Sequence, residues 1–460
     1  MSKFYVTTSI AYTNAPPHIG FAQELLAADV VARSKREQSF DVFYLTGTDE
    51  HGTKIAQAAK NAGKSAEEFV DELSNQFQVL TKELNISNDD FIRTTEERHI
   101  TQATDLWKKA SKTIEKRPYT GYYCSGCEMY VSEKDIEDGA CAIHKKTCEK
   151  VTEENYFFPL SHYTGHIKNY FEKNPDFVQP ESRKNEILSL LNEGLQDISV
   201  SRPVEKLSWG VPVPGDPSQT MYVWFDALSN YLLPLNYWPA DLHIIGKDIL
   251  RFHAALWPAM LMAAQMPLPK QIYVHGFITV DGQKMSKSLG NVISPFDLIK
   301  RYGVDATRYL LLRELSFDED GNFSWKKFDA RYNADLANDL GNLTQRVLTL
   351  AAKYNIEFKE LKDKNSKLAK KINAQINQLK FQDALTEIWQ LITLGNQYID
   401  QEKPWALTSD REKLEDVIGD LLGTIDIIAT LIKPFMPTTS VKIIEQIKSL
   451  KPEPLFPRLI

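Results

Sequence analysis

The chain has 460 residues, of which 43% are hydrophobic and 25% are charged, as in an average globular protein. This length exceeds one ordinary compact core and predicts roughly two to four packing units, which excludes a small binding module. The net charge of −7 argues against a general nucleic-acid coat, because nonspecific affinity comes mostly from lysines and arginines that neutralise phosphates. A local basic face is still compatible with that charge.

The N-terminus and the cysteines indicate the compartment. Residues Met1 to Val6 lack the apolar core of a signal peptide, and no apolar run approaches the roughly 18 residues that span a bilayer. All 4 cysteines, at positions 124, 127, 141 and 148, fall in one short stretch, whereas disulfides would be spread along the chain. We therefore expect a cytoplasmic protein without membrane contact, and a metal site instead of disulfides.

The N-terminal sequence predicts a strand over residues 3–8, a loop over 9–17 and a helix over 21–36. A second strand, over 41–47, leads into Thr48-Asp49-Glu50-His51-Gly52 and further helix-forming sequence. Strands that are separated by helices indicate a parallel sheet with both faces covered.

An insertion interrupts this alternation. It begins near Arg117, and short buried strands return over 242–245 and 271–274. From about Phe328 strand signals disappear, and apolar residues at 372, 376 and 379 have the spacing of amphipathic helices. We predict an α/β fold: a Rossmann-like parallel sheet, split by a zinc-containing insertion and followed by an all-α C-terminal bundle. The expected bounds are 1–116 and 221–280 for the two halves of the sheet domain, 117–220 for the insertion, 281–327 for a linking region and 328–460 for the bundle.

A first candidate site lies between the first strand and the first helix. Pro16-Pro17-His18-Ile19-Gly20 occupies the crevice where strand ends and a helix N-terminus favour an anion. There His18 can donate a hydrogen bond to a phosphate, and Gly20 permits close approach. A histidine that caps the helix explains so short a motif as well.

A second candidate is the loop from Asp281 to Asn291, which follows a predicted strand. It presents Lys284, Ser286, Lys287 and Ser288 on a loop flanked by glycines. Mobile ammonium groups suit a triphosphate, because they can move to where charge develops on a departing pyrophosphate. A solvated charged turn is an equally good explanation of this loop alone.

The cysteines have the spacing of a zinc knuckle. Cys124-x-x-Cys127 and Cys141-x-x-His144 are two tight pairs that suit one tetrahedral ion. Cys148 lacks the two-residue gap, so His144 is the favoured fourth ligand. Four protein ligands leave no open position, and such a zinc ion is structural. The alternative is a group of unligated thiols in a polar loop.

Taken together, these motifs resemble a known family. His18-Ile19-Gly20-Phe21 and Lys284-Met285-Ser286-Lys287-Ser288 resemble the signatures of class I aminoacyl-tRNA synthetases. The segments Thr46–Gly52, Tyr222–Leu228 and Gly246–His253 are similar to the methionyl branch in particular, and the resemblance covers essentially the whole chain. It implies that methionine is activated with ATP and Mg²⁺ to methionyl-adenylate and transferred to the terminal adenosine of tRNA(Met), with a structural Zn²⁺ in the insertion.

The resemblance also implies site residues, each matched to a family motif. The catalytic positions are His18, Lys284 and Lys287. ATP-binding positions are Asn14, His18, Gly20, Glu24, Gly246, Asp248, Ile278, Lys284 and Lys287. Methionine-binding positions are Ile10, Tyr12, Asp49, Trp224, Ala227, Leu228, Tyr231, Ile249 and His253, with Asp49 as the partner of the ammonium group. Anticodon-binding positions are Asn342, Arg346 and Trp405. Without the family motifs, Trp224 and Tyr231 would be interpreted as aromatic residues of the core, and the three anticodon positions as ordinary residues of a helical bundle.

One position departs from the family pattern. Phe21 stands where a second histidine is usual, and it cannot donate a hydrogen bond to a phosphate. A lost contact to a charged group costs about 1.5–3 kcal/mol, so we expect a working enzyme in which Gln23, Glu24 or the lysines compensate. The alternative is a catalytically impaired paralogue that acts as a tRNA-binding protein. We also expect a monomer, because no dimerising segment is recognisable after the bundle.

Overall fold

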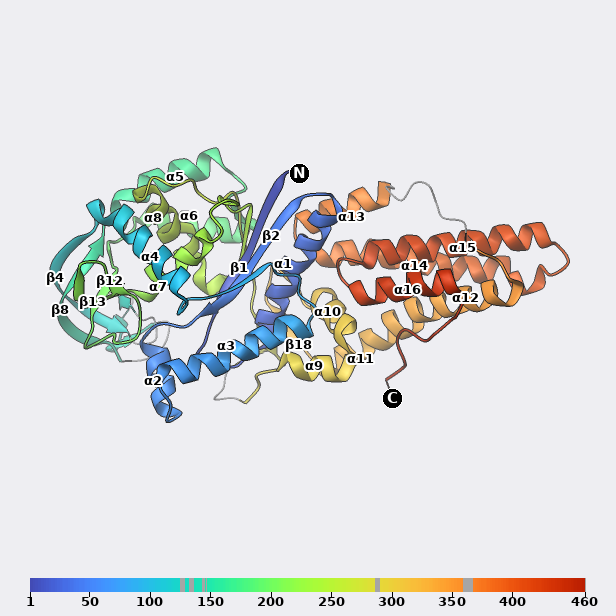
Figure 1. The fold of residues 1–460 in the computed structure, drawn as a ribbon, viewed down its shortest axis with the longest axis horizontal. Coiled ribbons are helices and arrows are strands. Elements are labelled where there is room, and N and C mark those ends of the chain that lie inside the picture. Colours follow the sequence, from blue (N-terminus) through green and yellow to red (C-terminus); the bar gives the residue numbers. More distant parts are fainter. Residues whose placement is uncertain are drawn as a thin grey trace. The chain divides into compact units, whose positions relative to one another are not determined.

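The computed structural model describes residues 1–124, 129–131, 136–142, 145, 147–285, 290–358 and 367–459. The chain folds as two compact units (Figure 1). The first comprises residues 1–17, 40–79 and 88–275, and the second comprises residues 18–39, 80–87 and 276–460. Helix α1 (Ile19–Glu37) therefore belongs to the second unit, although strand β1 (Lys3–Tyr12), which precedes it, belongs to the first. Within the described ranges no helix is long and apolar enough to cross a bilayer.

The main sheet of the first unit has six parallel strands in the order β3-β2-β1-β14-β15-β9. Besides β1 these are β2 (Asp41–Asp49), β3 (Asp90–Arg93), β9 (Val178–Gln179), β14 (Leu242–Gly246) and β15 (Ile272–His275). Strands β1 and β14 are neighbours, with Val6 beside Leu242, although more than two hundred residues separate them. The predicted parallel sheet is confirmed, and its two halves are split in sequence as expected.

Helices of the first unit pack on this sheet. Strands β14 and β15 are buried along their whole length, as in parallel sheets that are covered on both faces. Their side chains share one hydrophobic core with helices that include α4, α7 and α8, and Phe225 and Trp257 lie fully inside it. The helical elements of this unit are α2 (Thr53–Asn61), α3 (Ala66–Glu83, whose last residues belong to the second unit), α4 (Glu97–Ala110), η1 (Ser111–Thr113), η3 (Leu160–Tyr163), α5 (Thr164–Lys173), α6 (Glu181–Glu193), α7 (Val223–Leu228), η4 (Ser229–Leu232), η5 (Lys247–Ile249), the π-helical turn η6 (Phe252–Leu256) and α8 (Trp257–Ala263).

The insertion consists mainly of small antiparallel sheets. Long strands β4 (Glu115–Cys124) and β8 (Glu149–Phe158) pair along most of their length. Further strands are β5 (Met129–Val131), β6 (Ile136–Glu137), β7 (Ala140–Cys141), β10 (Ile198–Ser199), β11 (Ser201–Pro203), β12 (Pro212–Val213) and β13 (Asp216–Met221). Strand β9 comes from the same stretch of sequence but joins the parallel sheet beside β15, so the insertion is continuous with the sheet.

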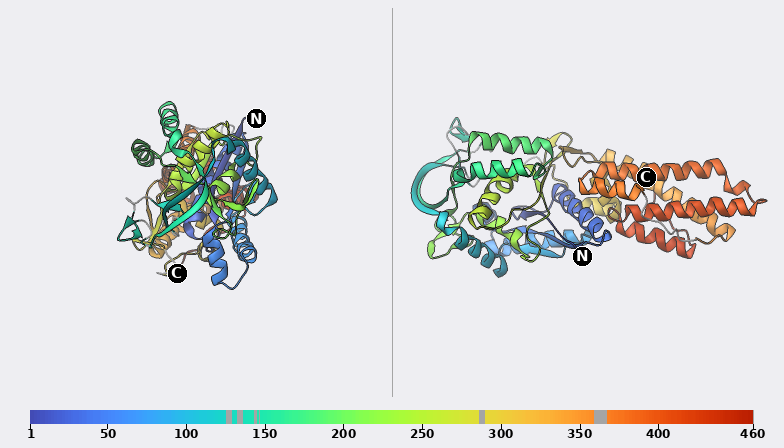
Figure 2. Two further views of the ribbon diagram at one scale, coloured as in Figure 1. Left: turned by 90° about the vertical axis from the view of Figure 1, so that its left-hand side faces the viewer. Right: turned by 90° about the horizontal axis from the view of Figure 1, so that it is seen from above.

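The second unit is mostly helical. Its bundle helices run side by side (Figure 2), which confirms the predicted helical C-terminal region. Its elements are α1, β16 (Ile278–Val280), β17 (Gln283–Lys284), α9 (Pro295–Tyr302), α10 (Val304–Arg313), β18 (Gly321–Phe323), α11 (Trp325–Arg331), the π-helical η7 (Tyr332–Gly341), α12 (Asn342–Tyr354), α13 (Lys367–Asn377), α14 (Phe381–Glu402), η8 (Pro404–Ala406), α15 (Arg411–Ile432) and α16 (Pro437–Ser449). The three short strands form one sheet in the order β17-β16-β18.

A buried arginine joins α1 to the bundle inside the second unit. The Arg308 guanidinium, on α10, is fully buried and donates to the Asp29 carboxylate of α1 at 2.7 Å. It also donates to the carbonyls of Leu84 (2.9 Å) and Phe435 (2.8 Å). Burial raises the pKa of Asp29, but Arg308, Arg33 and Ser87 lower the pKa by a larger amount, so the carboxylate is ionised and paired. These bonds fix the first helix against the residues between α15 and α16.

Candidate functional site

Candidate residues gather at the carboxyl edge of the parallel sheet, where ligands bind in open α/β sheets. Ile10 and Tyr12 lie at the end of β1, and Asp49 is the last residue of β2. Tyr12 and Asp49 are register partners, so their side chains leave neighbouring strands at the same level. Gly246 ends β14 nearby in the sheet order. The structure therefore brings these sequence-predicted positions to one edge.

A second group of candidates forms an aromatic wall in the first unit. Trp224, on α7, stacks on Phe252 with ring centroids 4.0 Å apart. The ring of His253 lies edge-on to Trp224 at 6.2 Å, and the Tyr231 hydroxyl is 2.8 Å from Nε2 of His253. Ala227 and Leu228 are buried on α7, one turn after Trp224. The π-helical turn η6 contains His253, and such turns are frequent at functional sites.

The hydrogen bonds of His253 fix its protonation state. Nδ1 is 3.0 Å from the carbonyl oxygen of Ile249, which can only accept, so Nδ1 carries the proton. Nε2 then accepts from the Tyr231 hydroxyl. Burial lowers the pKa of His253 to about 4, although the bond to Ile249 opposes the shift. The imidazole is therefore neutral at pH 7 and presents a polar but uncharged ring beside Trp224.

A buried carboxylate between two histidines connects the sheet edge to this wall. Asp226, on α7, accepts from Nδ1 of His51 at 2.7 Å and from Nε2 of His99 at 2.6 Å. Burial raises the pKa of Asp226, but the two histidines lower it to about 2, so the carboxylate is ionised. His51 follows Asp49 by two residues, and Asp226 lies between Trp224 and Ala227. The cluster thus holds the loop after β2 against α7.

In the second unit His18 is the N-cap of α1. Its Nδ1 accepts a hydrogen bond from the Gly20 backbone N–H at 3.1 Å, so the capping interpretation is confirmed. A Cβ at position 20 would lie 2.9 Å from Cε1 of His18, so a side chain there would displace the capping ring. Since Nδ1 accepts, the neutral ring carries its proton on Nε2. Capping and donation to an anion are therefore compatible, because the imidazole is exposed.

The loop that contains Lys284 meets the start of α1, also within the second unit. The Ile19 N–H donates to the Ile293 carbonyl at 3.2 Å. The terminal methyl of Met285 is 4.0 Å from the position that a Cβ of Gly20 would occupy. Lys284 is exposed, with its Nζ 4.9 Å from the ring centroid of Phe277. Segments more than 260 residues apart in the sequence are thus in contact, while Lys287 lies outside the described residues.

The other nucleotide candidates differ in exposure. Glu24 and Ile278 are buried, Asn14 is half-buried and Asp248 is exposed.

The surroundings of Phe21 bear on whether Gln23 replaces the phosphate contact that a second histidine would make. Phe21 is 8% exposed, and the Gln23 amide donates to the Leu311 carbonyl at 3.0 Å. The Gln23 side chain is therefore engaged with α10, which argues against it as a replacement phosphate contact.

The cysteines that the structure describes form a cluster. Cys124, Cys141 and Cys148 are buried together beneath Tyr122, Val131 and Ile136. Burial and the neighbouring thiols of Cys124 and Cys141 raise the pKa of Cys148. Cys148 therefore lies among the expected zinc ligands, although it was expected to be a spare. Cys127 and His144 lie outside the described residues, and the described side chains alone contain no set of three or more ligands that could hold a metal ion.

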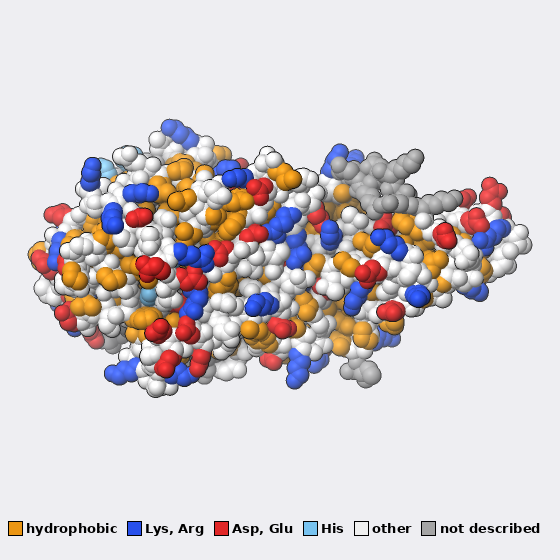
Figure 3. All heavy atoms as spheres, in the orientation of Figure 1, with side chains coloured by type: hydrophobic (Ala, Val, Ile, Leu, Met, Phe, Trp, Pro, Cys, Tyr) orange, Lys and Arg blue, Asp and Glu red, His pale blue; other side chains and the backbone are white. Residues whose placement is uncertain are grey.

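The predicted anticodon residues lie at one part of the bundle. Asn342 is the exposed first residue of α12, and Arg346, one turn later, forms an ion pair with Asp400 of α14 at 2.5 Å. Trp405, in η8 just after α14, is 48% exposed. Asn342 also lines a cavity of about 520 Å³ together with Gln345 and residues 454–456. Basic and acidic side chains are interspersed over the face in Figure 3, in line with the acidic composition.

Some residues of this region were not predicted. Glu50 and His51 stand inside the motif Thr46–Gly52, in which only Asp49 has a predicted role. Their partners Arg93 and His99 carry no motif, and only the pairing of β2 with β3 and the packing of α4 bring them close. Elsewhere in the first unit, Arg202 of β11 forms a buried ion pair with Glu153 at 2.7 Å.

Comparisons with known proteins agree with this architecture. The family model described as tRNA synthetases class I (M) matches residues 4–150 and 131–348. The model described as the anticodon binding domain of methionyl tRNA ligase matches residues 351–456. The chain belongs to the methionyl family of class I tRNA synthetases.

Individual relatives are similar along nearly the whole chain. A methionine–tRNA ligase of Caldanaerobacter subterraneus subsp. tengcongensis is 44% identical over 96% of this chain and 74% of the relative. That of Thermotoga maritima is 42% identical over 97% of this chain and 75% of the relative. Among solved structures, Mycobacterium tuberculosis methionyl-tRNA synthetase in complex with methionyl-adenylate superimposes with a TM-score of 0.92 at 38% identity, covering 100% of this chain and 99% of that one. The apo form of that enzyme gives a TM-score of 0.86 at 35% identity, with the same coverage of both chains.

Proposed function

We propose that the chain is a methionine–tRNA ligase, which activates methionine with ATP to methionyl-adenylate and transfers the methionyl group to the terminal adenosine of tRNA(Met). The observation that carries the proposal is the similarity of the whole chain to a methionyl-tRNA synthetase that was solved with methionyl-adenylate. The relatives are named as ligases, and no observation favours a catalytically impaired paralogue.

Activation requires positioning more than a protein nucleophile. The methionine carboxylate oxygen attacks the α-phosphorus of ATP, the bond to the bridging oxygen breaks, and pyrophosphate leaves. His18 donates from Nε2 to the phosphates, while Lys284 and Lys287 neutralise the charge that develops on the leaving group. Mg²⁺ enters with ATP as the counter-ion of its phosphates. The nucleotide is held by Asn14, Gly20, Glu24, Gly246, Asp248 and Ile278. The contact between the Lys284 loop and the first turn of α1 supports this arrangement.

Methionine recognition needs one acid and an apolar wall. Asp49 pairs with the α-ammonium group of methionine. The thioether side chain lies against the aromatic wall, where an uncharged His253 avoids the desolvation cost that a cation would bring. The full set of methionine contacts is Ile10, Tyr12, Asp49, Trp224, Ala227, Leu228, Tyr231, Ile249 and His253. The contact between Tyr231 and His253 and the register of Tyr12 beside Asp49 support this set.

The bundle reads the anticodon. Asn342, Arg346 and Trp405 contact the CAU bases by hydrogen bonding and stacking, which single-stranded RNA bases favour. Exposure of Asn342 and Trp405 at one part of the bundle supports this role. The protein acts as a cytoplasmic monomer, with the domain bounds expected from the sequence.

The insertion carries one structural Zn²⁺. Cys124, Cys127, Cys141 and His144 are its ligands, and a cluster of buried thiols is the donor chemistry that this ion prefers. Cys124 at the end of β4 and Cys141 at the end of β7 would hold the ion, and its binding would stabilise the fold of the insertion. Cys148 lies in the same cluster and is the alternative fourth ligand.

Methionine-dependent exchange of pyrophosphate into ATP tests the proposal. We expect exchange with methionine and none with leucine, isoleucine, valine or cysteine, followed by charging of tRNA(Met). Absence of exchange with every amino acid, with tRNA binding retained, would instead support the impaired paralogue.

A further inference from the structure

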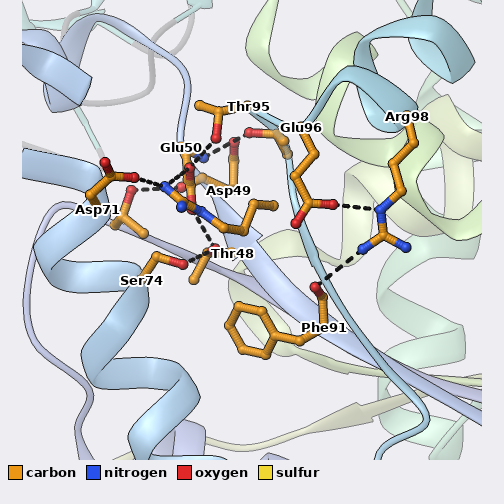
Figure 4. Close-up of polar contacts among 12 residues, drawn as sticks. Thr48, Asp49, Glu50, Asp71, Ser74, Phe91, Thr95, Glu96 and Arg98 are labelled. Carbon is orange, nitrogen blue, oxygen red and sulfur yellow. Dashed lines mark hydrogen bonds and ion pairs between the residues drawn. The ribbon is translucent and has the colours of Figure 1, made fainter. Parts of the chain in front are cut away.

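The carboxylate of Glu50 is the centre of a buried polar network beside Asp49 (Figure 4). Glu50 is fully buried, and Arg93, at the end of β3, donates to it through two parallel hydrogen bonds. These join Nε to Oε1 at 2.7 Å and Nη2 to Oε2 at 2.9 Å. The Thr48 hydroxyl adds a bond to Oε1 at 2.7 Å, and the Thr95 hydroxyl adds one to Oε2 at 2.6 Å. Each carboxylate oxygen therefore has two donors.

The backbone on both sides of Asp49 is fixed as well. The Asp49 carbonyl accepts from the N–H of Thr13 at 2.9 Å and from its hydroxyl at 3.0 Å. The Glu50 N–H donates to the Thr94 hydroxyl at 2.9 Å, and the Glu50 carbonyl accepts from the indole N–H of Trp209. These bonds determine the direction in which the Asp49 side chain leaves the sheet edge.

Arg93 compensates the charge of Glu50, which is next to Asp49 in the chain. Two adjacent buried carboxylates repel each other unless a nearby cation compensates their charge. Arg93 neutralises Glu50 and reaches the more exposed Asp71 with the same guanidinium. Burial lowers the pKa of Arg93, but its bonds to Glu50 and Asp71 raise the pKa by a larger amount, so the guanidinium stays charged. The charge of Glu50, next to Asp49 in the chain, is therefore compensated inside the network.

We propose that Arg93 is a positioning residue for methionine recognition: through its paired bonds to Glu50 it holds the Asp49 carboxylate in the place that binds the α-ammonium group. The inference rests on the proposed function, which assigns the ammonium group to Asp49. A role in stability alone would affect all ligands of the pocket equally. A positioning role would affect only ligands that carry the ammonium group.

The test compares methionine with 4-(methylthio)butanoate, which has the same thioether and carboxylate but no amine. Equilibrium binding of both is measured on the full chain and on Arg93→Lys, whose single ammonium cannot form two parallel bonds to Glu50. We expect methionine affinity to fall about tenfold to a hundredfold, as for a weakened bond to a charged group, while the affinity for the amine-free acid stays unchanged. Glu50→Gln, which keeps the side-chain volume, should show the same selective loss.

Arg98→Lys is the matched control. Arg98, on α4, pairs with Asp90 of β3 and with Glu96, and it is more exposed than Arg93. Figure 4 shows its contacts with Glu96 and with the Phe91 carbonyl, and within the described part of the chain it forms no bond to residues 48–52. We expect its affinities for both ligands to equal those of the unmodified protein, and thermal unfolding identifies any variant that fails to fold. Equal losses for the two ligands, or unchanged methionine binding in folded Arg93→Lys and Glu50→Gln, would overturn the inference. Methionine-dependent pyrophosphate exchange by the unmodified protein tests the proposed function separately.

Discussion

His253 links the aromatic wall to the pH dependence of stability. Its pKa is about 4 in the folded protein and about 6.5 in an unfolded chain. Between these values the unfolded state binds more protons, so lowering the pH through this window destabilises the fold. The contribution of this histidine is about 2 kcal/mol between pH 7 and pH 5. We expect His253→Gln to lose less stability than the unmodified protein over this interval, measured by urea unfolding at both pH values. Equal losses would contradict the assignment.

Phe21 allows a prediction about the first signature. Its ring is nearly buried in α1, so a histidine there would place a polar ring in an apolar site. We expect Phe21→His to lower the free energy of unfolding by about 1–3 kcal/mol without raising the rate of pyrophosphate exchange. Urea unfolding and exchange kinetics of the purified variant measure both effects. A rise in exchange rate of tenfold or more would indicate that the ring reaches the phosphates and that a donor is missing.

Individual contacts were predictable only where a motif is local. His253 ends one quoted motif and Tyr231 follows another by three residues, and the structure joins the two side chains through one hydrogen bond. Glu50 and Arg93 are 43 residues apart. Their meeting depends on the alignment of β2 with β3, which no residue spacing encodes.

Strand β1 is longer than its local sequence predicts, because its last residues pair with β2. Its sequence predicts a strand over residues 3–8, yet the strand extends to Tyr12 after an irregularity between Thr7 and Ile10. The extra residues pair with Gly47–Asp49 of β2, and that pairing outweighs the loop-like local sequence. The extension carries Ile10 and Tyr12 to the sheet edge, so the prediction missed the part of the strand that positions the site.

The insertion yields a prediction about its metal. If His144 is the fourth ligand, Cys148→Ser should bind one Zn²⁺ and leave the thiolate charge-transfer bands of a cobalt-substituted protein unchanged, since the thiolate count stays the same. Cys141→Ser is the matched control and should weaken both metal binding and these bands. Weaker bands in Cys148→Ser would instead make Cys148 a ligand. Removal of the ion with a chelator should unfold the insertion first, detected by increased proteolysis within residues 117–220.

The grouping of helix α1 in one compact unit with the bundle could not be predicted from the sequence. The alternation of strands and helices predicted the parallel sheet, and the helical spacing of apolar residues after Phe328 predicted the helical region, because both patterns have clear periodicity. Neither pattern predicted that α1 belongs to the unit that contains the bundle. That grouping depends on buried contacts such as Arg308 to Asp29, between residues 279 apart that carry no motif.

Methionine activation and anticodon recognition are assigned to different parts of the chain, so we expect substitutions to affect them separately. Trp405 lies on the bundle and is half exposed, so Trp405→Ala should raise the KM for tRNA(Met) by about fivefold to 150-fold, as expected for a lost stacking contact of roughly 1–3 kcal/mol. Pyrophosphate exchange without tRNA should be unchanged. Trp325→Ala, at another exposed tryptophan of the second unit, is the control and should leave exchange unchanged. A loss of exchange in Trp405→Ala would contradict this separation.

His18 and Lys284 are predicted to act together on one triphosphate. Methionine-dependent pyrophosphate exchange by His18→Asn, Lys284→Ala and the double variant measures this joint action most directly, since asparagine preserves the helix cap but removes the Nε2 donor. We expect each single variant to lose about a hundredfold in rate while methionine binding persists, and the double variant to lose less than the product of the two. Exchange at the unmodified rate in either single variant, or no methionine-dependent exchange by the unmodified protein, would contradict the account.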